Sequence, residues 1–342
     1  MKLQDWIEVS SRPIEGYFLV TTDNLVFEVK EVLQPAERLI AYLRYAPDSS
    51  GERCLYDGTR LSKMVDLKDR EAYLRSMAPE YIWLDSSKGR EIESVPNERI
   101  AYLLDPVDSL KELRDMGSHL DNLQQTSVDL ARLLVEESKI DWSDVGITGS
   151  QLVGLHTEKS DVDLVVYGES PARRVYQTLK RHSASLAEVE SYSGCALDQH
   201  TRFRWGGVPQ FLDLLREREN RKVLQGLFRG YEFFVRVVKL PEEMMIVYGD
   251  VVCHHMGEIE AVCRIVDDRD SIFTPAEYDV SSESMSGLVK VVSYRGRFTE
   301  HAHTGERVRI RGRLEEVTLV SSGKKYQQVV LGEKPSDYMV PV

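Results

Sequence analysis

The sequence lacks a long apolar run, and its first residues, 1–6, hold no apolar stretch of the kind that a signal peptide needs. No run approaches the roughly 20 apolar residues that span a bilayer. The content of 42% hydrophobic and 29% charged residues is typical of a globular chain and not of a disordered one. We therefore expect a cytoplasmic protein that does not associate with membranes.

Cysteine is scarce: four residues are scattered over 342 positions, and none forms a Cys-x-x-Cys pair. Scattered thiols in a cytoplasmic chain predict reduced, structural cysteines. The run Cys253-His254-His255 could suggest zinc, but adjacent residues of a strand face opposite ways and no fourth ligand is evident. We therefore do not expect a zinc site there.

Basic residues are outnumbered, with 44 Lys and Arg against 56 Asp and Glu, which gives a net charge of −12. Proteins that bind nucleic acid without specificity depend on Lys and Arg to neutralise phosphates. The composition therefore argues against a general nucleic-acid coat protein. It leaves room for one local basic surface, or for a small nucleotide that arrives with its metal.

Length and texture predict an α+β chain of several domains. Residues 1–105 mix strand-like runs and turns and are expected to form an α+β module. Pro106 suits a helix start, and residues 106–242 are expected to form a central mixed β-sheet with flanking helices. Residues 243–342 show short strand-like runs between turns, which predict a small antiparallel β-barrel or sandwich.

The strongest local pattern is residues 149–154, Gly-Ser-Gln-Leu-Val-Gly, which follow a short apolar strand. The bare amide groups of such a turn favour a bound anion. Six positions later begins Ser160-Asp161-Val162-Asp163, and strand geometry places both Asp side chains on one face. Like charges so close repel unless a cation lies between them, and a divalent ion shared with substrate phosphates is the natural one. The pattern therefore indicates phosphoryl or nucleotidyl chemistry.

Gly-Ser-x-x-x-Gly followed by Asp-x-Asp in an apolar strand resembles the signature of the polymerase-β-like nucleotidyltransferase superfamily. The likeness covers about residues 145–168, and the chain as a whole resembles a group of uncharacterised archaeal proteins described as nucleotidyltransferases. One departure is clear. Many members carry Arg or Lys just before the second Gly, where this chain has Val153, so that phosphate contact must come from elsewhere.

The resemblance implies a nucleotidyltransferase-type central sheet and a metal-dependent enzyme. It would transfer a nucleoside monophosphate from an NTP to a hydroxyl acceptor and release pyrophosphate. Three carboxylates would hold two divalent ions, Mg²⁺ or Mn²⁺, and the ions would stabilise the in-line displacement. Asp161 and Asp163 would be two of the metal ligands, and Gly149 with Ser150 would bind the nucleotide.

The third carboxylate is expected on a following strand. Glu232 opens the run 231–239, and Arg236 shares its strand face, so Glu232 is the expected catalytic and metal-binding residue and Arg236 a nucleotide-binding cation. Asp213 is the rival, because it lies between apolar residues. Pro209 before it and the charged residues after it favour a helix, which we expect to run from about residue 209 to 227.

Two groups of basic residues suggest a polymeric acceptor. Arg307, Arg309, Arg311 and Arg313 share one parity and would project from one strand face toward an RNA, although charged edge strands are also commonly solvated. In the N-terminal module, Arg38, Tyr42, Arg44 and Tyr45 could face a substrate or could pack as cross-strand pairs.

An alternative function stays open. The chain could be a catalytically inactive nucleotidyltransferase fold that acts as a nucleotide-sensing or RNA-binding module. A third carboxylate far from Asp161 and Asp163 would favour that alternative. The sequence does not identify the NTP, the acceptor or the oligomeric state.

Overall fold

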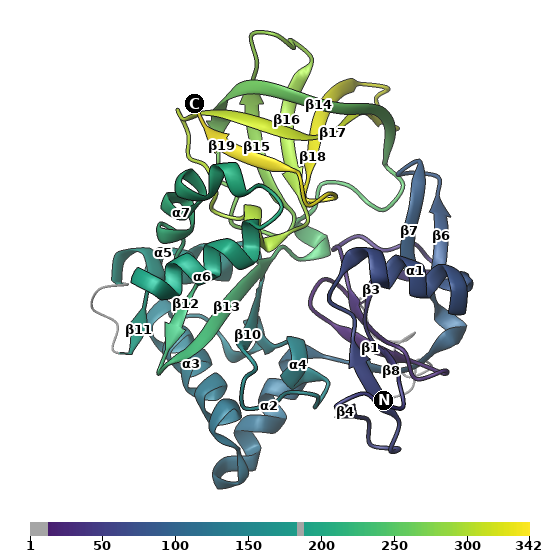
Figure 1. Cartoon of the computed structure of the whole chain (residues 1–342), viewed down its shortest axis with the longest axis vertical. Coiled ribbons are helices and arrows are strands. Elements are labelled where there is room, and N and C mark those ends of the chain that lie inside the picture. Colours follow the sequence, from purple (N-terminus) through teal and green to yellow (C-terminus); the bar gives the residue numbers. More distant parts are fainter. Residues whose placement is uncertain (1–12, 183–187) are drawn as a thin grey trace.

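The computed structural model describes residues 13–182 and 188–342, so residues 1–6, where a signal peptide was not expected, lie outside the described residues. The described chain forms three β-sheets, drawn in Figure 1 from purple at the N-terminus to yellow at the C-terminus. The first sheet lies within residues 18–104, the second within 145–238 and the third within 251–341. The domain boundaries at 105/106 and 242/243 stay predictions.

The N-terminal sheet has the strand order β4-β5-β3-β2-β1-β8, with β7 beside β3 and β6 beside β7. Its strands are β1 (Phe18–Thr21), β2 (Val26–Val29), β3 (Arg38–Pro47), β4 (Arg53–Cys54), β5 (Arg60–Lys63), β6 (Ile82–Asp85), β7 (Arg90–Pro96) and β8 (Ile100–Leu104). Helix α1 (Leu67–Met77) starts at Asp66, whose side chain accepts two amide hydrogen bonds as an N-cap. Its Leu74 is buried against this sheet with Phe27 and Tyr81.

The central sheet has the order β11-β12-β13-β10-β9 and is mixed: β10 runs parallel to β13 and antiparallel to β9. The strands are β9 (Val145–Ile147), β10 (Val162–Tyr167), β11 (Val189–Glu190), β12 (Gln225–Phe228) and β13 (Tyr231–Val238). The helices are α2 (Pro106–Met116), α3 (Asn122–Ser138), α4 (Gly149–Leu152), α5 (Glu169–His182), α6 (Gly194–Trp205) and α7 (Leu212–Asn220).

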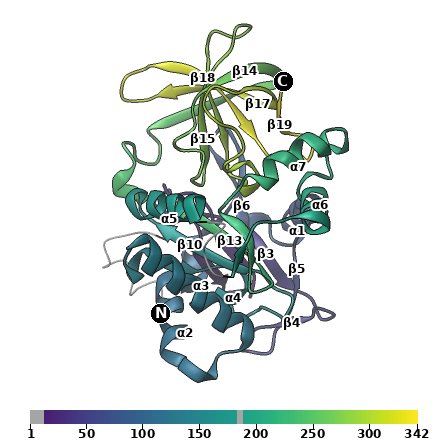
Figure 2. The same cartoon turned by 90° about the vertical axis from the view of Figure 1, so that its left-hand side faces the viewer.

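Helices α3 and α5 lie beside each other against the central sheet (Figure 2). Their apolar residues Leu130, Leu134, Val175 and Leu179 are buried in the core of this part. The expected mixed sheet with flanking helices is therefore present. The helix expected over residues 209–227 is wrong in its extent, because α7 ends at Asn220 and residues 225–228 form β12. The antiparallel pairing of β12 with β13 takes these residues out of a helix.

The C-terminal strands are β14 (Val251–Asp267), β15 (Ala276–Ser281), β16 (Leu288–Ser293), β17 (Arg307–Leu319), β18 (Lys325–Leu331) and β19 (Tyr338–Pro341). Their order is β14-β15-β16-β18-β17-β19, and β14 also pairs with β17, so the pairing returns to its first strand. The sheet is not purely antiparallel as expected, because β16 and β18 run parallel. After the segment that connects β16 to β17, the strands β17 and β18 form an antiparallel hairpin. The second strand of this hairpin, β18, lies beside β16 and runs in the same direction.

Two apolar clusters hold the N-terminal sheet against the central part. In the first, Phe18, Tyr45 and Leu61 pack on Leu152 and Val153 of the turn that follows β9. In the second, Ile14 and Val32 pack on the central sheet. The N-terminal sheet is thereby fixed beside the Gly-Ser turn. No helix in the described ranges combines the length and apolarity that a membrane span requires.

Candidate functional site

The Gly-Ser turn is pressed against the second aspartate of the acidic pair. Gly149 has a φ of +67°, and a Cβ at this position would lie 2.2 Å from Oδ2 of Asp163. The Thr148 amide donates to the Asp163 carbonyl at 2.9 Å. After the single turn of α4, the Leu155 amide donates to the Ser150 carbonyl at 2.9 Å. Glycine is therefore required at 149 both by its backbone conformation and by the carboxylate beside it.

The acidic pair lies at the start of β10. Val162 and Leu164 are buried, so the alternation of the strand turns Asp161 and Asp163 to the opposite face. The parallel register pairs Val162 with Phe233, which places Glu232 beside Asp161 on the neighbouring strand. Asp213 instead lies exposed in the first turn of α7. Of the two expected candidates for the third carboxylate, Glu232 is the one next to the pair.

The carboxylates influence one another. Burial, followed by the charge of Asp161, raises the pKa of Asp163 to about 6. Burial, followed by the charge of Glu232, raises the pKa of Asp161. A raised pKa in a group of neighbouring carboxylates means that their negative charge is incompletely compensated, and a bound cation would relieve it. Two hard oxygen donors on one strand face suit a divalent ion such as Mg²⁺.

Glu232 also accepts a hydrogen bond from outside the acidic pair. Its Oε2 accepts from the Tyr192 hydroxyl at 2.8 Å, and the Tyr192 ring stacks on His200 of α6 with ring centroids 4.1 Å apart. Within residues 13–182 and 188–342, no three side chains of His, Cys, Asp or Glu lie close enough together to hold a metal ion. The three-carboxylate metal site therefore stays a prediction.

A pocket of about 570 Å³ opens over the acidic pair and the Gly-Ser turn. Its lining includes Gly149, Ser150, Asp161 and Asp163, together with residues of the N-terminal sheet and of the loop before β10. The remaining lining residues are Phe18, Arg44, Tyr45, Glu52, Arg53, Lys63, Thr157, Glu158, Lys159 and Ser160. The structure thus brings four of the six predicted site residues to one pocket.

Three of the cations in that lining come from the N-terminal sheet: Arg44, Arg53 and Lys63. Burial and the charge of Arg44 lower the pKa of the Lys63 ammonium, while Asp163 and Asp161 act in the opposite direction. The sequence suggested a substrate-facing position for Arg44 and Tyr45 but gave no signal for Arg53 and Lys63. Their position follows from the docking of one sheet on another, which no local pattern encodes.

Arg236, the sixth predicted site residue, lies in a buried ionic cluster and is not part of the pocket lining. Its guanidinium pairs with Glu15 and, at 2.6 Å, with Glu28, and Lys30 contacts both of these carboxylates. Burial opposes the charged form, but Glu28 and Glu15 raise the pKa of Arg236 above its ordinary value. Its charge is largely used in joining β13 to the N-terminal sheet, and its role toward a nucleotide stays a prediction.

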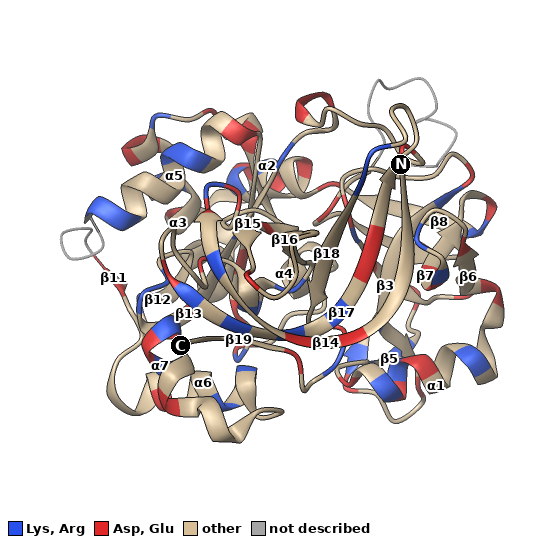
Figure 3. Ribbon diagram, turned by 90° about the horizontal axis from the view of Figure 1, so that it is seen from above, with Lys and Arg blue, Asp and Glu red and all other residues tan. Residues whose placement is uncertain are grey.

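The arginine strand follows the predicted alternation. Arg307, Arg309 and Arg311 are exposed on β17, and the residues between them are buried. Arg313 is half-buried and pairs with Glu315 and, at 2.6 Å, with Glu333. Figure 3 shows basic residues along β17 next to acidic residues of the neighbouring β14. Three of the four arginines are therefore exposed, and of these Arg309 lies 3.9 Å from Glu260 of β14.

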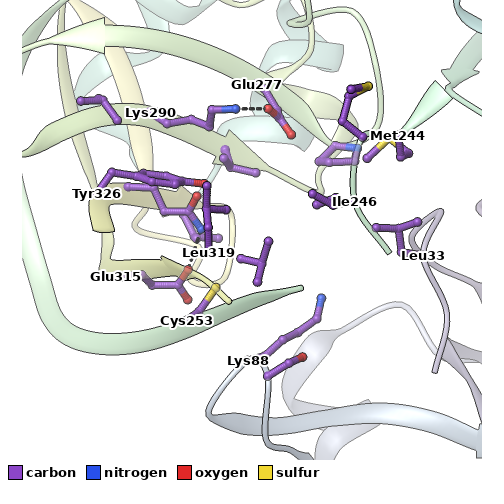
Figure 4. A pocket seen from close by; sticks show the side chains of 18 of the residues that line it. Leu33, Lys88, Met244, Ile246, Cys253, Glu277, Lys290, Glu315, Leu319 and Tyr326 are labelled. Carbon is purple, nitrogen blue, oxygen red and sulfur yellow. Dashed lines mark hydrogen bonds and ion pairs between the residues drawn. The ribbon is translucent and has the colours of Figure 1, made fainter. Parts of the chain in front are cut away.

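A larger cavity of about 1030 Å³ lies between the outer face of the C-terminal sheet and the N-terminal part (Figure 4). An ion pair between Lys290 and Glu277, at 2.5 Å, crosses one wall. Burial, followed by the charge of Glu315, raises the pKa of Cys253 to about 12, so this thiol is protonated at neutral pH. The cavity also holds two carboxylates of one strand, Glu277 and Asp279 of β15, but Glu277 is paired with Lys290 and the Gly-Ser turn does not line this cavity. The smaller pocket combines an acidic pair with that turn and is therefore the catalytic candidate.

Comparison with known proteins agrees with this choice. Residues 129–219 match the nucleotidyltransferase domain family, a segment that contains the Gly-Ser turn and the acidic pair but ends before Glu232. The chain is 24% identical over 325 residues to the uncharacterized protein MJ1086 of Methanocaldococcus jannaschii, covering 92% of this chain and 94% of that protein. No solved structure matches the chain. The predicted resemblance to polymerase-β-like nucleotidyltransferases, and to an uncharacterised archaeal protein, is thereby confirmed.

Proposed function

We propose that this protein is a metal-dependent nucleotidyltransferase, which moves a nucleoside monophosphate from an NTP to a hydroxyl acceptor and releases pyrophosphate. One observation carries the proposal. Asp161 and Asp163 project from one face of β10 into a pocket that also exposes the Gly149-Ser150 turn, within the segment that matches nucleotidyltransferase domains. An anion-binding turn beside a carboxylate pair is the arrangement that nucleotidyl transfer needs.

Each residue of the pocket has its own proposed role in the reaction. Asp161 and Asp163 would hold Mg²⁺ or Mn²⁺, with Glu232 joining them once it leaves the Tyr192 hydroxyl. The bound ions would supply activation of the attacking hydroxyl and charge neutralisation at the phosphates. Gly149 lets the backbone approach the ligand closely, and Ser150 offers its hydroxyl and amide to a phosphate.

RNA is the acceptor that the surface supports best. Arg307, Arg309 and Arg311 form an exposed row on a small sheet whose pairing returns to its first strand. Small closed barrels are a common scaffold for oligonucleotide binding, and phosphate neutralisation by Arg supplies much of the affinity. Arg313, which we also expected to contact RNA, would contribute less because Glu315 and Glu333 already pair with it.

A second candidate function rests on the position of Glu232. Because its carboxylate is bound to Tyr192, and because the described residues contain no three-ligand metal cluster, an inactive nucleotide-sensing or RNA-binding module is the competing proposal. A sensor would bind an NTP without turning it over.

The test follows the fate of labelled phosphates. We would incubate the full chain and Mg²⁺ with each NTP, labelled at its α- or its γ-phosphate, and add a short RNA oligonucleotide. The proposal predicts that the γ-label appears in pyrophosphate, and that Asp161→Asn and Asp163→Asn abolish this release. Asp213→Asn, an exposed carboxylate on α7, is the control and should leave release unchanged.

Transfer of the γ-label to an acceptor or to inorganic phosphate would overturn nucleotidyl transfer. NTP binding without any pyrophosphate release would favour the sensor. A covalent α-label on the RNA would identify the acceptor class, whereas an α-label on another hydroxyl compound would exclude RNA.

A further inference from the structure

Position 153, where many nucleotidyltransferases carry Lys or Arg, is a buried Val in this chain. Val153 is 6% exposed and packs in one cluster with Phe18, Tyr45 and Leu61 of the N-terminal sheet. A Lys or Arg here would place a charge in that apolar contact, which is costly without a partner. The turn therefore uses this position to dock the N-terminal sheet and not to bind phosphate.

The docked sheet supplies cations to the same pocket. Arg44 on β3, Arg53 on β4 and Lys63 on β5 line the cavity of about 570 Å³ together with Asp161 and Asp163. Across the described residues, no carboxylate lies within ion-pair distance of the Lys63 ammonium. Arg44 lies 3.3 Å from Glu28, and its side chain remains 37% exposed. These side chains can therefore still accept an anionic ligand.

The cations are held in a fixed position relative to the acidic pair. The Arg53 guanidinium donates to the carbonyl of Leu155, just after the Gly-Ser turn. The Thr148 hydroxyl donates to the Gly16 carbonyl at 2.6 Å, immediately before that turn. The buried pairs between Arg236 and the N-terminal glutamates join the two sheets behind the site. A preorganised site loses less free energy on binding than a flexible one.

The charge of the lining fits a metal-bound triphosphate. Its basic members are Arg44, Arg53, Lys63 and Lys159, and its acidic members are Glu52, Glu158, Asp161 and Asp163. Glu52 and Glu158 are exposed on loops at the edge. Divalent ions would neutralise the aspartates, which leaves the N-terminal cations facing the phosphates. Arg and Lys are the side chains that bind phosphate oxygens most strongly.

We propose that the N-terminal sheet completes the nucleotide site and that Lys63 and Arg44, supported by Arg53, bind the triphosphate of the NTP. This inference rests on the proposed function and names a part of that site which lies outside the matched segment 129–219. The N-terminal sheet is then a phosphate-binding element of the catalytic site, in addition to any role in acceptor recognition.

The experiment is calorimetric titration of the full chain, in Mg²⁺, with each NTP, the matching NDP and NMP, and inorganic tripolyphosphate. The variants are Lys63→Ala, Arg44→Ala and the charge-retaining Lys63→Arg. Arg60→Ala is the matched control, because Arg60 is exposed on the same strand and does not line the pocket. Far-ultraviolet circular dichroism and thermal melting would establish that each variant is folded.

We expect Lys63→Ala and Arg44→Ala each to weaken binding of NTP and tripolyphosphate about tenfold or more, as the loss of a charge-assisted contact predicts. NMP binding should change little, Lys63→Arg should restore most of the affinity, and Arg60→Ala should match the wild type. If the wild type binds an NTP and the folded alanine variants bind it equally well, the phosphate role is wrong while the proposed function stands. If the wild type binds neither NTP nor tripolyphosphate, both fail.

Discussion

At the scale of single residues, Gly149 and Asp163 constrain each other. The positive φ of Gly149 is disfavoured for other residues, and a Cβ there would overlap the Asp163 carboxylate. We predict that Gly149→Ala costs about 1–2 kcal/mol of unfolding free energy from its backbone alone. It should also abolish metal-dependent NTP binding, because Asp163 must move.

Gly58→Ala separates these two effects. Gly58 also has a positive φ, +89°, but nothing lies within 4 Å of a Cβ built there. Its alanine variant should lose a similar amount of stability in urea denaturation and keep NTP binding. Retention of binding by Gly149→Ala would show that the turn does not position Asp163.

A second residue-scale prediction concerns His301, which is buried and packs beside Trp205, with tilted rings whose centroids lie 5.1 Å apart. Its Nε2 lies 2.7 Å from the Met339 carbonyl. Burial, followed by the charge of Lys222, lowers the pKa of His301 to about 3. The native imidazole therefore stays neutral as the pH falls, whereas the unfolded one takes up a proton near pH 6.5.

Between about pH 6.5 and 3 the unfolded state binds a proton at His301 that the native state does not bind, so the free energy of unfolding decreases as the pH falls. The stability that His301 contributes is therefore present above about pH 6.5 and is lost as the pH falls toward 3. Between pH 7 and 5 the loss is about 2 kcal/mol. Urea denaturation of wild type and His301→Gln at both pH values measures it. The difference in free energy between the two proteins should shrink at pH 5, while the opposite contribution of buried Glu300, whose pKa is raised to about 7, is common to both. Parallel pH curves would contradict the prediction.

At the scale of elements, strands β2 and β13 are joined through charge. Arg236 of β13 faces Glu28 of β2 and Glu15, all buried or half-buried. Arg236→Ala would leave two buried carboxylates with Lys30 as their main partner, and we predict a loss of about 3–5 kcal/mol. Arg132→Ala removes an exposed pair with Asp129 and should cost less than about 1 kcal/mol. Equal losses in chemical denaturation would show that the cluster is not a stabilising contact.

Some strands can be predicted from the local sequence pattern, and others cannot. The apolar run around Asp161 and the alternating residues 307–313 fix which face of each strand is buried, so β10 and β17 could be predicted. The strand at 225–228 could not, because its residues follow a helical stretch and become a strand only through pairing with β13. The position of Glu232 beside Asp161 could be predicted from the strand, whereas its hydrogen bond with Tyr192 depends on the packing of the Tyr192 ring on His200 of α6.

At the scale of the whole molecule, the site depends on contacts between sheets that are distant in sequence. Asp161, Asp163 and the Gly-Ser turn carry a recognisable pattern, whereas Lys63 and Arg53 reach the pocket only because the N-terminal sheet docks on Leu152 and Val153. The Lys and Arg residues within 1–105 follow no period or motif that would indicate which of them line the pocket. The nucleotidyltransferase resemblance was therefore predictable, and the N-terminal wall of the pocket was not.

The arginine row on β17 makes a prediction about RNA binding. Replacing Arg307, Arg309 and Arg311 by Ala should lower the affinity for a single-stranded RNA and reduce the slope of log K against log salt by about 2. Fluorescence anisotropy at several salt concentrations measures both quantities. The control changes the same net charge elsewhere: Lys68, Arg75 and Lys111, exposed on α1 and α2, should give little change when replaced by Ala. Equal losses in the two variants would indicate only a general charge effect.

Calorimetric titration of each NTP, with and without Mg²⁺, tests whether β10 carries a metal-dependent nucleotide site. The wild type and the double variant Asp161→Asn/Asp163→Asn would be compared after both are shown to be folded. We expect at least one NTP to bind the wild type only when Mg²⁺ is present and not to bind the double variant. NTP binding that is indifferent to both Mg²⁺ and the substitutions, or no NTP binding by the folded wild type, would contradict it.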